Sequence, residues 1–375
     1  MKKNIFILIL LLFISWKDSS NSFLVDSAEG VIFLKWNQAY NKDTIEKNII
    51  GLKWALSYVG ANILNKENIQ NDKENLRIDV SKMRFSKNAE KSLIKIHQKI
   101  KESEEYKTNH SIDLGRYISL LLGSSEHYYA LTETPMSLED ITKNYNLKSE
   151  KAYINNSDVS KEHRIIRFSE QNRFNQLFIS KEIDSITGQV YEFETIELMK
   201  NGQIRFGIFD ANGKRKIAAD SNHSNAGKPA KCIWCHESSI QPLFSDQKDK
   251  KGYLSLKDLQ KTLETYRKIN NDLKIKVTDT LNHINYKKTQ DHTFTEILYT
   301  SFMEPSAKRL ALEWNMSEMQ VKTKLKNYKT HQHHEFVYLG ELYHRNEIEH
   351  LAPLKSIPVS GNIREKSNQE VNYLQ

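Results

Sequence analysis

Apolar residues recur at helical spacing near the start of the chain. Asp43 or Thr44 can cap a helix whose apolar stripe is made of Ile45, Ile49, Leu52, Leu56, Val59 and Ile63. Because the steps between these positions alternate between four and three residues, their side chains share one helix face. The pattern predicts an amphipathic helix packed on a core.

Further helical patterns follow this first helix. Apolar positions at helical spacing cover residues 88–100 and 112–122. Ser137 and Asp140 have the spacing of a capping box, in which the first side chain accepts a hydrogen bond from the backbone of the second residue. The sequence therefore predicts a mainly helical domain over residues 23–160.

From His163 onward, apolar residues recur at every second position instead of at helical spacing. Alternating patterns predict strands over residues 164–168, 175–180, 189–199 and 203–209. Between the last two strands stands Lys200-Asn201-Gly202, and an Asn-Gly pair favours the positive φ angles of a type I′ turn. We expect an antiparallel sheet within residues 161–250.

The chain becomes helical again after residue 250. Three pairs have the spacing of helix-capping residues: Ser255 with Asp258, Thr293 with Glu296, and Ser317 with Gln320. The residues after Pro353 carry no regular pattern. The predicted fold class is thus α+β, with a helical N-terminal part, a central antiparallel sheet and a helical C-terminal region over residues 251–375.

The first residues have the composition of an export signal. Lys2 and Lys3 precede an apolar run that continues to Trp16, and small polar residues follow up to Ser22. A run of about 12 residues extends about 18 Å as a helix, which is short against a bilayer core of about 30 Å. We interpret residues 1–22 as a Sec signal peptide and expect a periplasmic or secreted protein that is not an integral membrane protein.

The net charge of the whole chain is +8, and removal of residues 1–22 reduces it to about +6. A basic balance can indicate nucleic acid as a partner, but export removes most of that case. The charge is more simply a solvated surface, or a docking face for an acidic redox partner. We expect no nucleic-acid partner.

Both cysteines of the chain lie in one segment, Cys232-Ile233-Trp234-Cys235-His236. This C-x-x-C-H spacing is the attachment sequence for c-type haem. Two thiols three residues apart can form thioether bonds to the two vinyl groups of a haem, and the adjacent histidine then lies beneath the iron as an axial ligand. The pattern predicts one covalent haem c on Cys232 and Cys235, with His236 as the metal ligand. Thioether formation occurs outside the cytoplasm and requires haem-attachment machinery.

Two other interpretations of the cysteine pair stay open. A C-x-x-C pair can be half of a zinc site, although the chain has no second pair and the next histidine is His283. It can also be a thioredoxin-like redox pair, which requires a strand leading by a short turn into a helix that begins at the first cysteine. Here a long loop precedes Cys232.

The segment around the motif resembles a known family. Phe206, Gly207, Phe209, Asp210 and Gly213, followed by Lys228-Pro229-Ala230 and the C-x-x-C-H motif, are similar to the hydroxylamine-oxidising mono-haem cytochromes. The resemblance covers about residues 190–245 and implies a sheet packed on a c-type haem. This chain continues about 130 residues past the motif, unlike that family. The family also joins a lysine to its haem, for which this chain offers no matching lysine, so the family's enzymatic activity is not carried over.

The sixth iron ligand decides between two functions. A methionine or histidine there gives an electron carrier, whereas an open position allows the chemistry or sensing of small molecules. The candidates are Met303, His223 and His283, and Met303-Glu304-Pro305 matches the methionine segment of small cytochromes poorly. We expect electron transfer first, and a haem enzyme or gas sensor acting on a small nitrogen or oxygen species as the alternative. The histidines at 331, 333 and 334 could bind a metal, but a polar connecting segment is the simpler interpretation.

Overall fold

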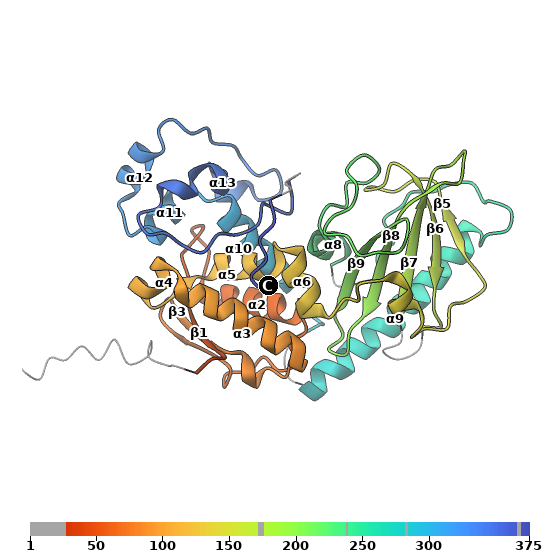
Figure 1. Cartoon of the computed structure of the whole chain (residues 1–375), viewed down its shortest axis with the longest axis horizontal. Coiled ribbons are helices and arrows are strands. Elements are labelled where there is room, and N and C mark those ends of the chain that lie inside the picture. The colour runs from red at the N-terminus through yellow and green to blue at the C-terminus, as the bar shows by residue number, and fades with distance from the viewer. Residues whose placement is uncertain (1–27, 172–175, 238, 282–283, 366–368) are drawn as a thin grey trace, which may run out of the picture.

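The structure is a computed structural model, and it describes residues 28–171, 176–237, 239–281, 284–365 and 369–375. The predicted signal peptide lies outside the described residues. Figure 1 shows two bodies side by side, which we call the helical body and the sheet body. The helical body is formed by both ends of the described chain, and the sheet body by its middle. The predicted α+β class is confirmed.

The helical body contains a sheet that the sequence analysis did not predict. Its strands lie in the order β2-β3-β1-β4, with β1 (Val31–Lys35), β2 (Ile69–Asp72), β3 (Asn75–Asp79) and β4 (Ile112–Asp113). The pairs β1–β3 and β2–β3 are antiparallel, and β1–β4 is parallel. Residues 23–160 are therefore not simply helical. Four of the five residues of β1 are buried, so this strand lacks the polar alternation that marks a half-exposed strand.

Helices of the N-terminal half cover this small sheet: α2 (Ile45–Tyr58), α3 (Lys87–Glu102), α4 (Glu104–Asn109), α5 (Leu114–Leu122) and α6 (Ser125–Thr132). Of the two predicted caps, Asp43 and Thr44, it is Thr44 that caps α2, because its side chain accepts a hydrogen bond from the Lys47 amide. The helix ends at Tyr58, before the predicted stripe does, and Gly60 follows with φ +101°. The predicted start at residue 112 is wrong by two residues, since Ile112 belongs to β4.

The sheet body is built on five antiparallel strands in chain order: β5 (Ala152–Ile154), β6 (His163–Phe168), β7 (Leu177–Ile183), β8 (Val190–Leu198) and β9 (Ile204–Asp210). The predicted central antiparallel sheet is confirmed. One face packs on α7 (Leu138–Thr142), which begins at the predicted cap Ser137. The opposite face packs on α9 (Leu256–Leu281), through Leu259, Leu263 and Tyr266. Figure 1 shows α9 running across this sheet.

The β8–β9 turn differs from the predicted type I′ turn. Gly202 has a φ of +85°, but Asn201 is not among the residues with positive φ. The Gly202 amide bonds the Met199 carbonyl at 3.0 Å, and the Met199 amide bonds the Gln203 carbonyl at 2.7 Å. The loop thus has three residues and a left-handed glycine at its end, which is the next most common hairpin geometry.

The C-terminal part returns to the helical body through α10 (Thr293–Met303), α11 (Ala307–Glu313), α12 (Glu318–Lys324) and α13 (Arg345–Ile348). Helix α10 packs against α2 and α5. The predicted capping box at Ser317 is confirmed. The one at Thr293 is wrong, because a 3-10 turn (Thr289–His292) leads directly into α10 and the Thr293 hydroxyl donates to the Gln290 carbonyl. Among the described residues after Pro353 there is no helix or strand, as predicted.

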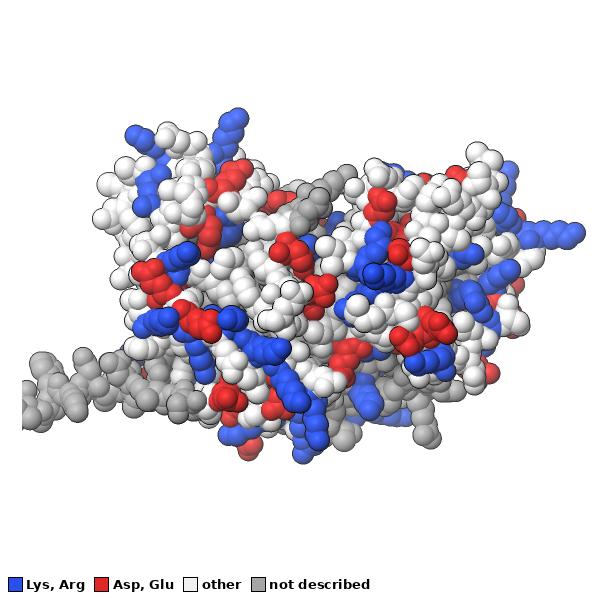
Figure 2. All heavy atoms as spheres, viewed as in Figure 1, with Lys and Arg blue, Asp and Glu red and all other residues white. Residues whose placement is uncertain are grey.

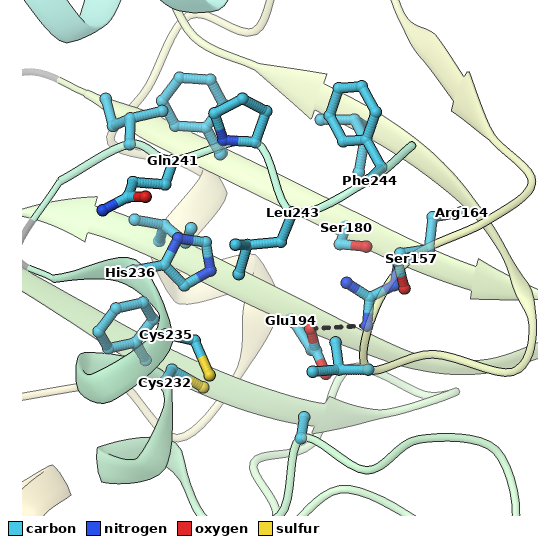
Figure 3. Close-up of a pocket in the computed structure, with 18 of the residues that line it drawn as sticks. Ser157, Arg164, Ser180, Glu194, Cys232, Cys235, His236, Gln241, Leu243 and Phe244 are labelled. Carbon is cyan, nitrogen blue, oxygen red and sulfur yellow. Dashed lines mark ion pairs between the residues drawn. The ribbon is translucent and has the colours of Figure 1, made fainter. Parts of the chain in front are cut away.

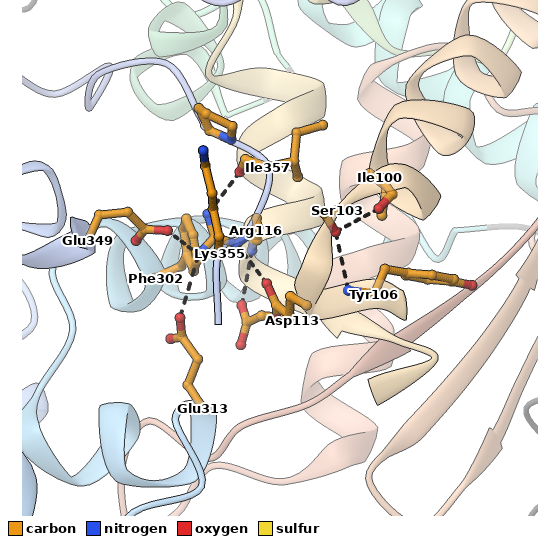
Figure 4. A network of polar contacts seen from close by, with 12 residues as sticks. Ile100, Ser103, Tyr106, Asp113, Arg116, Phe302, Glu313, Glu349, Lys355 and Ile357 are labelled. Carbon is orange, nitrogen blue, oxygen red and sulfur yellow. Dashed lines mark hydrogen bonds and ion pairs between the residues drawn. The ribbon is translucent and has the colours of Figure 1, made fainter. Parts of the chain in front are cut away.

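A buried ionic network fastens the C-terminal helices to α5 (Figure 4). It contains Asp113, Arg116, Arg309, Glu313, Arg345 and Glu349. Glu313 lies at its centre, 2.6 Å from Arg345 and 2.5 Å from Arg309. The Arg345 guanidinium also stands 3.9 Å from the centre of the Phe302 ring. Because all of these charges except Glu349 are almost completely buried, each of them depends on its partners for compensation.

Candidate haem site

The C-x-x-C-H motif forms a short helix of its own, α8 (Cys232–His236), directly after a 3-10 turn that begins with Pro229. Proline suits the first position of such a turn because its φ is already fixed near the helical value. Helix α8 ends at Glu237, which has a φ of +48°. The sequence Lys228 to Glu237 therefore specifies a tight, isolated turn of helix at the end of a long loop.

The back of α8 is anchored in the helical body. Ile233 and Trp234 are buried in its core, where the Trp234 ring lies 6.3 Å from the ring of Tyr299. Lys228, also buried, donates to the Gly123 carbonyl at 3.0 Å and to the Glu370 carboxylate at 2.6 Å. The two residues between the cysteines thus hold one side of α8 in place, which leaves its other side to face the sheet body.

Cys232, Cys235 and His236 all line one cavity (Figure 3). Cys232 and His236 are half-buried, Cys235 is exposed, and both cysteines are free thiols. Residues three apart on a helix lie on the same face, so the two sulfur atoms point in the same direction. Figure 3 shows both sulfurs and the His236 ring turned into the cavity. The structure brings the three residues predicted from the motif together at one wall.

The cavity lies between α8, the face of the sheet that α9 partly covers, and residues 240–244. Its free space, mouth included, is about 1090 Å³. The lining is mostly apolar: Ile154, Val159, Ile166, Phe178, Ile196, Phe206, Ile208, Ile240, Pro242, Leu243, Phe244, Leu259 and Leu263. A concave, mainly apolar site with a few polar groups is typical of cofactor sites.

His236 has the properties of an imidazole ligand. Burial, assisted by the positive charge of Arg164, lowers the pKa of His236 to about 4. The imidazole is therefore neutral at physiological pH, which is the form that binds metals. Its Nδ1 atom is buried without a hydrogen-bond partner, and the ring packs 5.5 Å from the ring of Phe206. The donor set, an orphaned buried imidazole beside two thiols and an apolar cavity, fits a c-type haem.

The cysteine environment does not favour the two other interpretations of the pair. Burial raises the pKa of both thiols, whereas a thioredoxin-like pair needs a thiol whose pKa is lowered. For zinc, four ligands must converge on the metal. Within the described parts of the chain, the cysteines belong to no group of three or more metal-ligating side chains whose donor atoms lie within 4.8 Å of one another.

The candidates for a sixth iron ligand lie elsewhere. Met303 is buried in the core of the helical body. His223 pairs with Glu162 at 2.9 Å and stacks on Tyr191, with 3.7 Å between the ring centres. His283 lies outside the described residues. Among the described residues that line the cavity, His236 is the one histidine and there is no methionine.

The three C-terminal histidines do not line the cavity either. His331 accepts or donates a hydrogen bond with Glu304 at 2.8 Å and stacks on His344, with 4.3 Å between ring centres. His333 lies beside His334, with 5.1 Å between ring centres. These residues form part of an irregular polar segment, and none of them is among the cavity-lining residues.

Sequence reasoning missed a polar group on the same cavity wall. Arg164 of β6 and Glu194 of β8 line the cavity and pair with one another at 3.2 Å, as Figure 3 shows. Ser180 of β7 lies opposite Glu194 in the sheet register. The alternation of residues along β8 could have indicated this polar group. Glu192, Glu194 and Ile196 occupy every second position and so share one face of the strand.

Comparison with known proteins does not place the chain in a family. No protein-family model, curated protein or solved structure matches it. Within the described residues, none of the helices combines the length and the apolar composition that a membrane span requires. On the face shown in Figure 2, basic and acidic side chains are interspersed over both bodies.

Proposed function

We propose that this chain is an exported mono-haem c-type cytochrome whose iron keeps one position open for a small ligand. The observation that carries the proposal is the convergence of Cys232, Cys235 and the neutral imidazole of His236 on one apolar cavity. These are the three groups that covalent haem attachment requires, and they are in the order that it requires. Electron transfer, the first expectation from the sequence, is part of this function because a haem iron cycles by single electrons.

Each residue of the site has a separate task. The thiols of Cys232 and Cys235 form the two thioether bonds, and His236 offers an imidazole nitrogen from the same helical turn. The apolar side chains of the sheet and of α9 exclude water and bury the flat ring. When bound, haem would supply a redox-active iron whose coordination the surrounding protein limits.

The cavity lining favours an open iron position over a closed one. An electron carrier of the usual kind closes its iron with a second histidine or a methionine. Met303 and His223 both lie away from the cavity, and each is engaged by other residues. Arg164, Ser180 and Glu194 instead place polar atoms on the sheet wall, where they can contact a small polar ligand. A haem enzyme or sensor for a small nitrogen or oxygen species is therefore favoured over a simple carrier.

Export and partners follow from the same proposal. Thioether formation takes place outside the cytoplasm, in agreement with a signal peptide over residues 1–22. The chain then needs haem-attachment machinery during maturation and a redox partner afterwards. A net charge of about +6 for the mature chain suits a partner with an acidic surface.

Carbon monoxide binding tests the open position. We expect the reduced, haem-bearing protein to bind carbon monoxide rapidly, with a large change in its absorption spectrum, because among the described residues no methionine and no histidine other than His236 lines the cavity. Met303→Leu and His223→Gln are matched controls and should leave the spectrum and the binding rate unchanged. A reduced protein that does not respond to carbon monoxide would establish a closed iron and a simple electron carrier. A spectral change in either control variant would identify that residue as the sixth ligand.

A further inference from the structure

A cluster of three glutamates, two of them fully buried, adjoins the haem cavity through Glu194. Glu182 of β7 is directly opposite Glu192 of β8, and Glu194 follows two residues later on the same face. One carboxylate oxygen from each lies within 4.8 Å of the other two. Glu182 and Glu192 have no solvent exposure at all. Like charges directly opposite one another in a sheet are destabilising, so the cluster needs compensation.

Two cations compensate most of this charge. Arg164 forms a very short contact with Glu182 and lies 3.2 Å from Glu194. Lys216, in the segment after β9, lies 3.1 Å from Glu192. If all three glutamates are ionised, one negative charge remains. A buried charge without a partner is costly, so this state is unfavourable.

The hydrogen bonds of the cluster leave carboxylate oxygens without a donor, and one added proton can supply it. Glu192 Oε2 accepts from the Asp220 amide at 3.0 Å, and Glu182 Oε2 accepts from the Ser160 hydroxyl at 3.1 Å. Glu192 Oε1 and Glu194 Oε1 are buried and have no partner. A proton on one carboxyl group supplies the missing donor and brings the cluster to neutrality. A divalent cation would instead leave one excess positive charge beside Arg164.

We propose that Glu182, Glu192 and Glu194 form a proton-binding site that is linked to the oxidation state of the haem. This inference rests on the proposed function. Arg164 and Glu194 line the same cavity as Cys232 and His236, so an electron added to the iron raises the negative charge next to the cluster. The electron comes from the redox partner, and the cluster takes up one proton from solvent. Oxidation returns the electron to an acceptor and the proton to solvent.

The two fully buried carboxyl groups of the cluster have raised pKa values. Burial raises the pKa of Glu182 to about 8, helped by the charge of Glu194 and opposed by Arg164. Burial also raises the pKa of Glu192. The charged and titratable groups around the cluster come from β6, from the loops on either side of the sheet and from α8: Arg164, Lys216, Asp220, Cys232 and the pair formed by Glu162 and His223.

The sign of the linkage follows from these charges. Reduction favours the protonated cluster, so its pKa is higher in the reduced protein than in the oxidised one. Between these two pKa values, reduction takes up a proton and becomes less favourable as pH rises. The expected dependence is a tenfold change in the redox equilibrium constant per pH unit, about 59 mV for one electron.

Potentiometric titration of the full-length haem protein tests the inference. The midpoint potential is measured from about pH 6 to about pH 10, across the region where the raised pKa values lie. Glu192→Gln leaves two carboxylates for two cations, so its potential should no longer depend on pH in this range. Glu150→Gln, at an exposed site, is the matched control and should keep the dependence of the natural chain. Reduction should also produce a carboxylic-acid band in the infrared difference spectrum, because one carboxylate gains a proton, and this band should be absent in Glu192→Gln.

Ser160→Ala provides a milder variant if Glu192→Gln does not fold. It removes the hydrogen bond that lowers the pKa of Glu182, so the pH-dependent region should move to higher pH. Two results would overturn this inference but not the proposed function: a haem-bearing chain whose midpoint potential does not depend on pH, or a Glu192→Gln variant whose potential depends on pH as in the natural chain. One equivalent of tightly bound calcium or magnesium, lost in Glu192→Gln, would also overturn it in favour of a cation site. A chain without haem would contradict the proposed function itself.

Discussion

Replacing both Cys232 and Cys235 with serine is expected to abolish covalent haem. The double variant, exported with intact attachment machinery, should lose all porphyrin absorption from the denatured polypeptide, because no other thiol exists in the chain. Each single variant should keep one thioether bond. In the reduced state, the absorption maximum of each single variant should move to longer wavelength, since the unreacted vinyl group extends the conjugated ring. Absorption after denaturation, compared with the natural chain, measures both effects.

The matched control for these variants is Trp234→Phe. Trp234 lies between the two cysteines but faces the helical body, so its replacement should change stability slightly and leave haem attachment intact. Porphyrin that stays with the denatured double variant would show that haem attachment does not use these thiols. Loss of haem in Trp234→Phe alone would show that the packing of α8, rather than the thiols, limits attachment.

Glu313→Gln is expected to be the most destabilising change outside the haem site. Removing one partner from a buried ion pair leaves the other charge uncompensated, and such losses amount to about 3–5 kcal/mol. Glu313 pairs with Arg345, with Arg309 and, at 3.7 Å, with Arg116, so three arginines lose a partner. The free energy of unfolding of the haem-bearing protein, from urea titration at neutral pH, measures the loss. Glu318→Gln, in an exposed pair with Lys322, is the control and should change it by less than about 1 kcal/mol.

The same variant should show a defined pH dependence. Burial alone would raise the pKa of Glu313, but the charges and hydrogen bonds of Arg345 and Arg309 outweigh it and lower the pKa to about 2. A lowered pKa in the folded state contributes stability above the unfolded value, near pH 4.5, and this contribution is lost as pH falls towards 2. The difference between the natural chain and Glu313→Gln should therefore shrink below about pH 4.5. A difference that stays constant down to pH 3 would mean that Glu313 acts by packing rather than by charge.

The parts of the fold that the sequence predicted are those that depend on neighbouring residues. The starts of α2 and α12 follow from Thr44 and Ser317, whose side chains bond amides three residues away. The β8–β9 turn depends on distant contacts. The Asn201 side chain donates to the Ser57 carbonyl at 2.8 Å and to the Ala61 carbonyl at 2.9 Å, at the end of α2. Such tertiary bonds override the turn type that an Asn-Gly pair favours by itself.

The candidate site also has one part that neighbouring residues specify and another part that depends on distant contacts. Cys232, Cys235 and His236 could be predicted because five consecutive residues carry the whole motif. The cavity in front of them could not be predicted, because its walls come from distant parts of the chain. They are five strands that precede the motif and α9, whose lining residues follow it by more than 20 residues. The acidic cluster depends on register, since a shift of one residue would turn Glu192 to the opposite face of the sheet. Sequence periodicity shows alternation within a strand but not which residues meet across strands.

The helical body accounts for the long segments that flank the motif. Its core holds Ile233 and Trp234, and the C-terminal residue Glu370 binds Lys228 just before the motif. Residues from both ends of the chain thus fix the position of α8 against the sheet body. This arrangement explains why the C-x-x-C-H motif and its small sheet are accompanied by more than 200 further residues.

The mass of the intact, denatured chain tests covalent haem attachment most directly. The protein is produced with its own N-terminal segment in a host that exports it and attaches haem, then unfolded in acid and extracted with organic solvent. We predict one species whose mass exceeds that of the processed polypeptide by one haem, and a peptide containing residues 232–236 that carries the porphyrin. An unmodified polypeptide mass from the exported, folded protein would contradict the haem site and every function proposed from it.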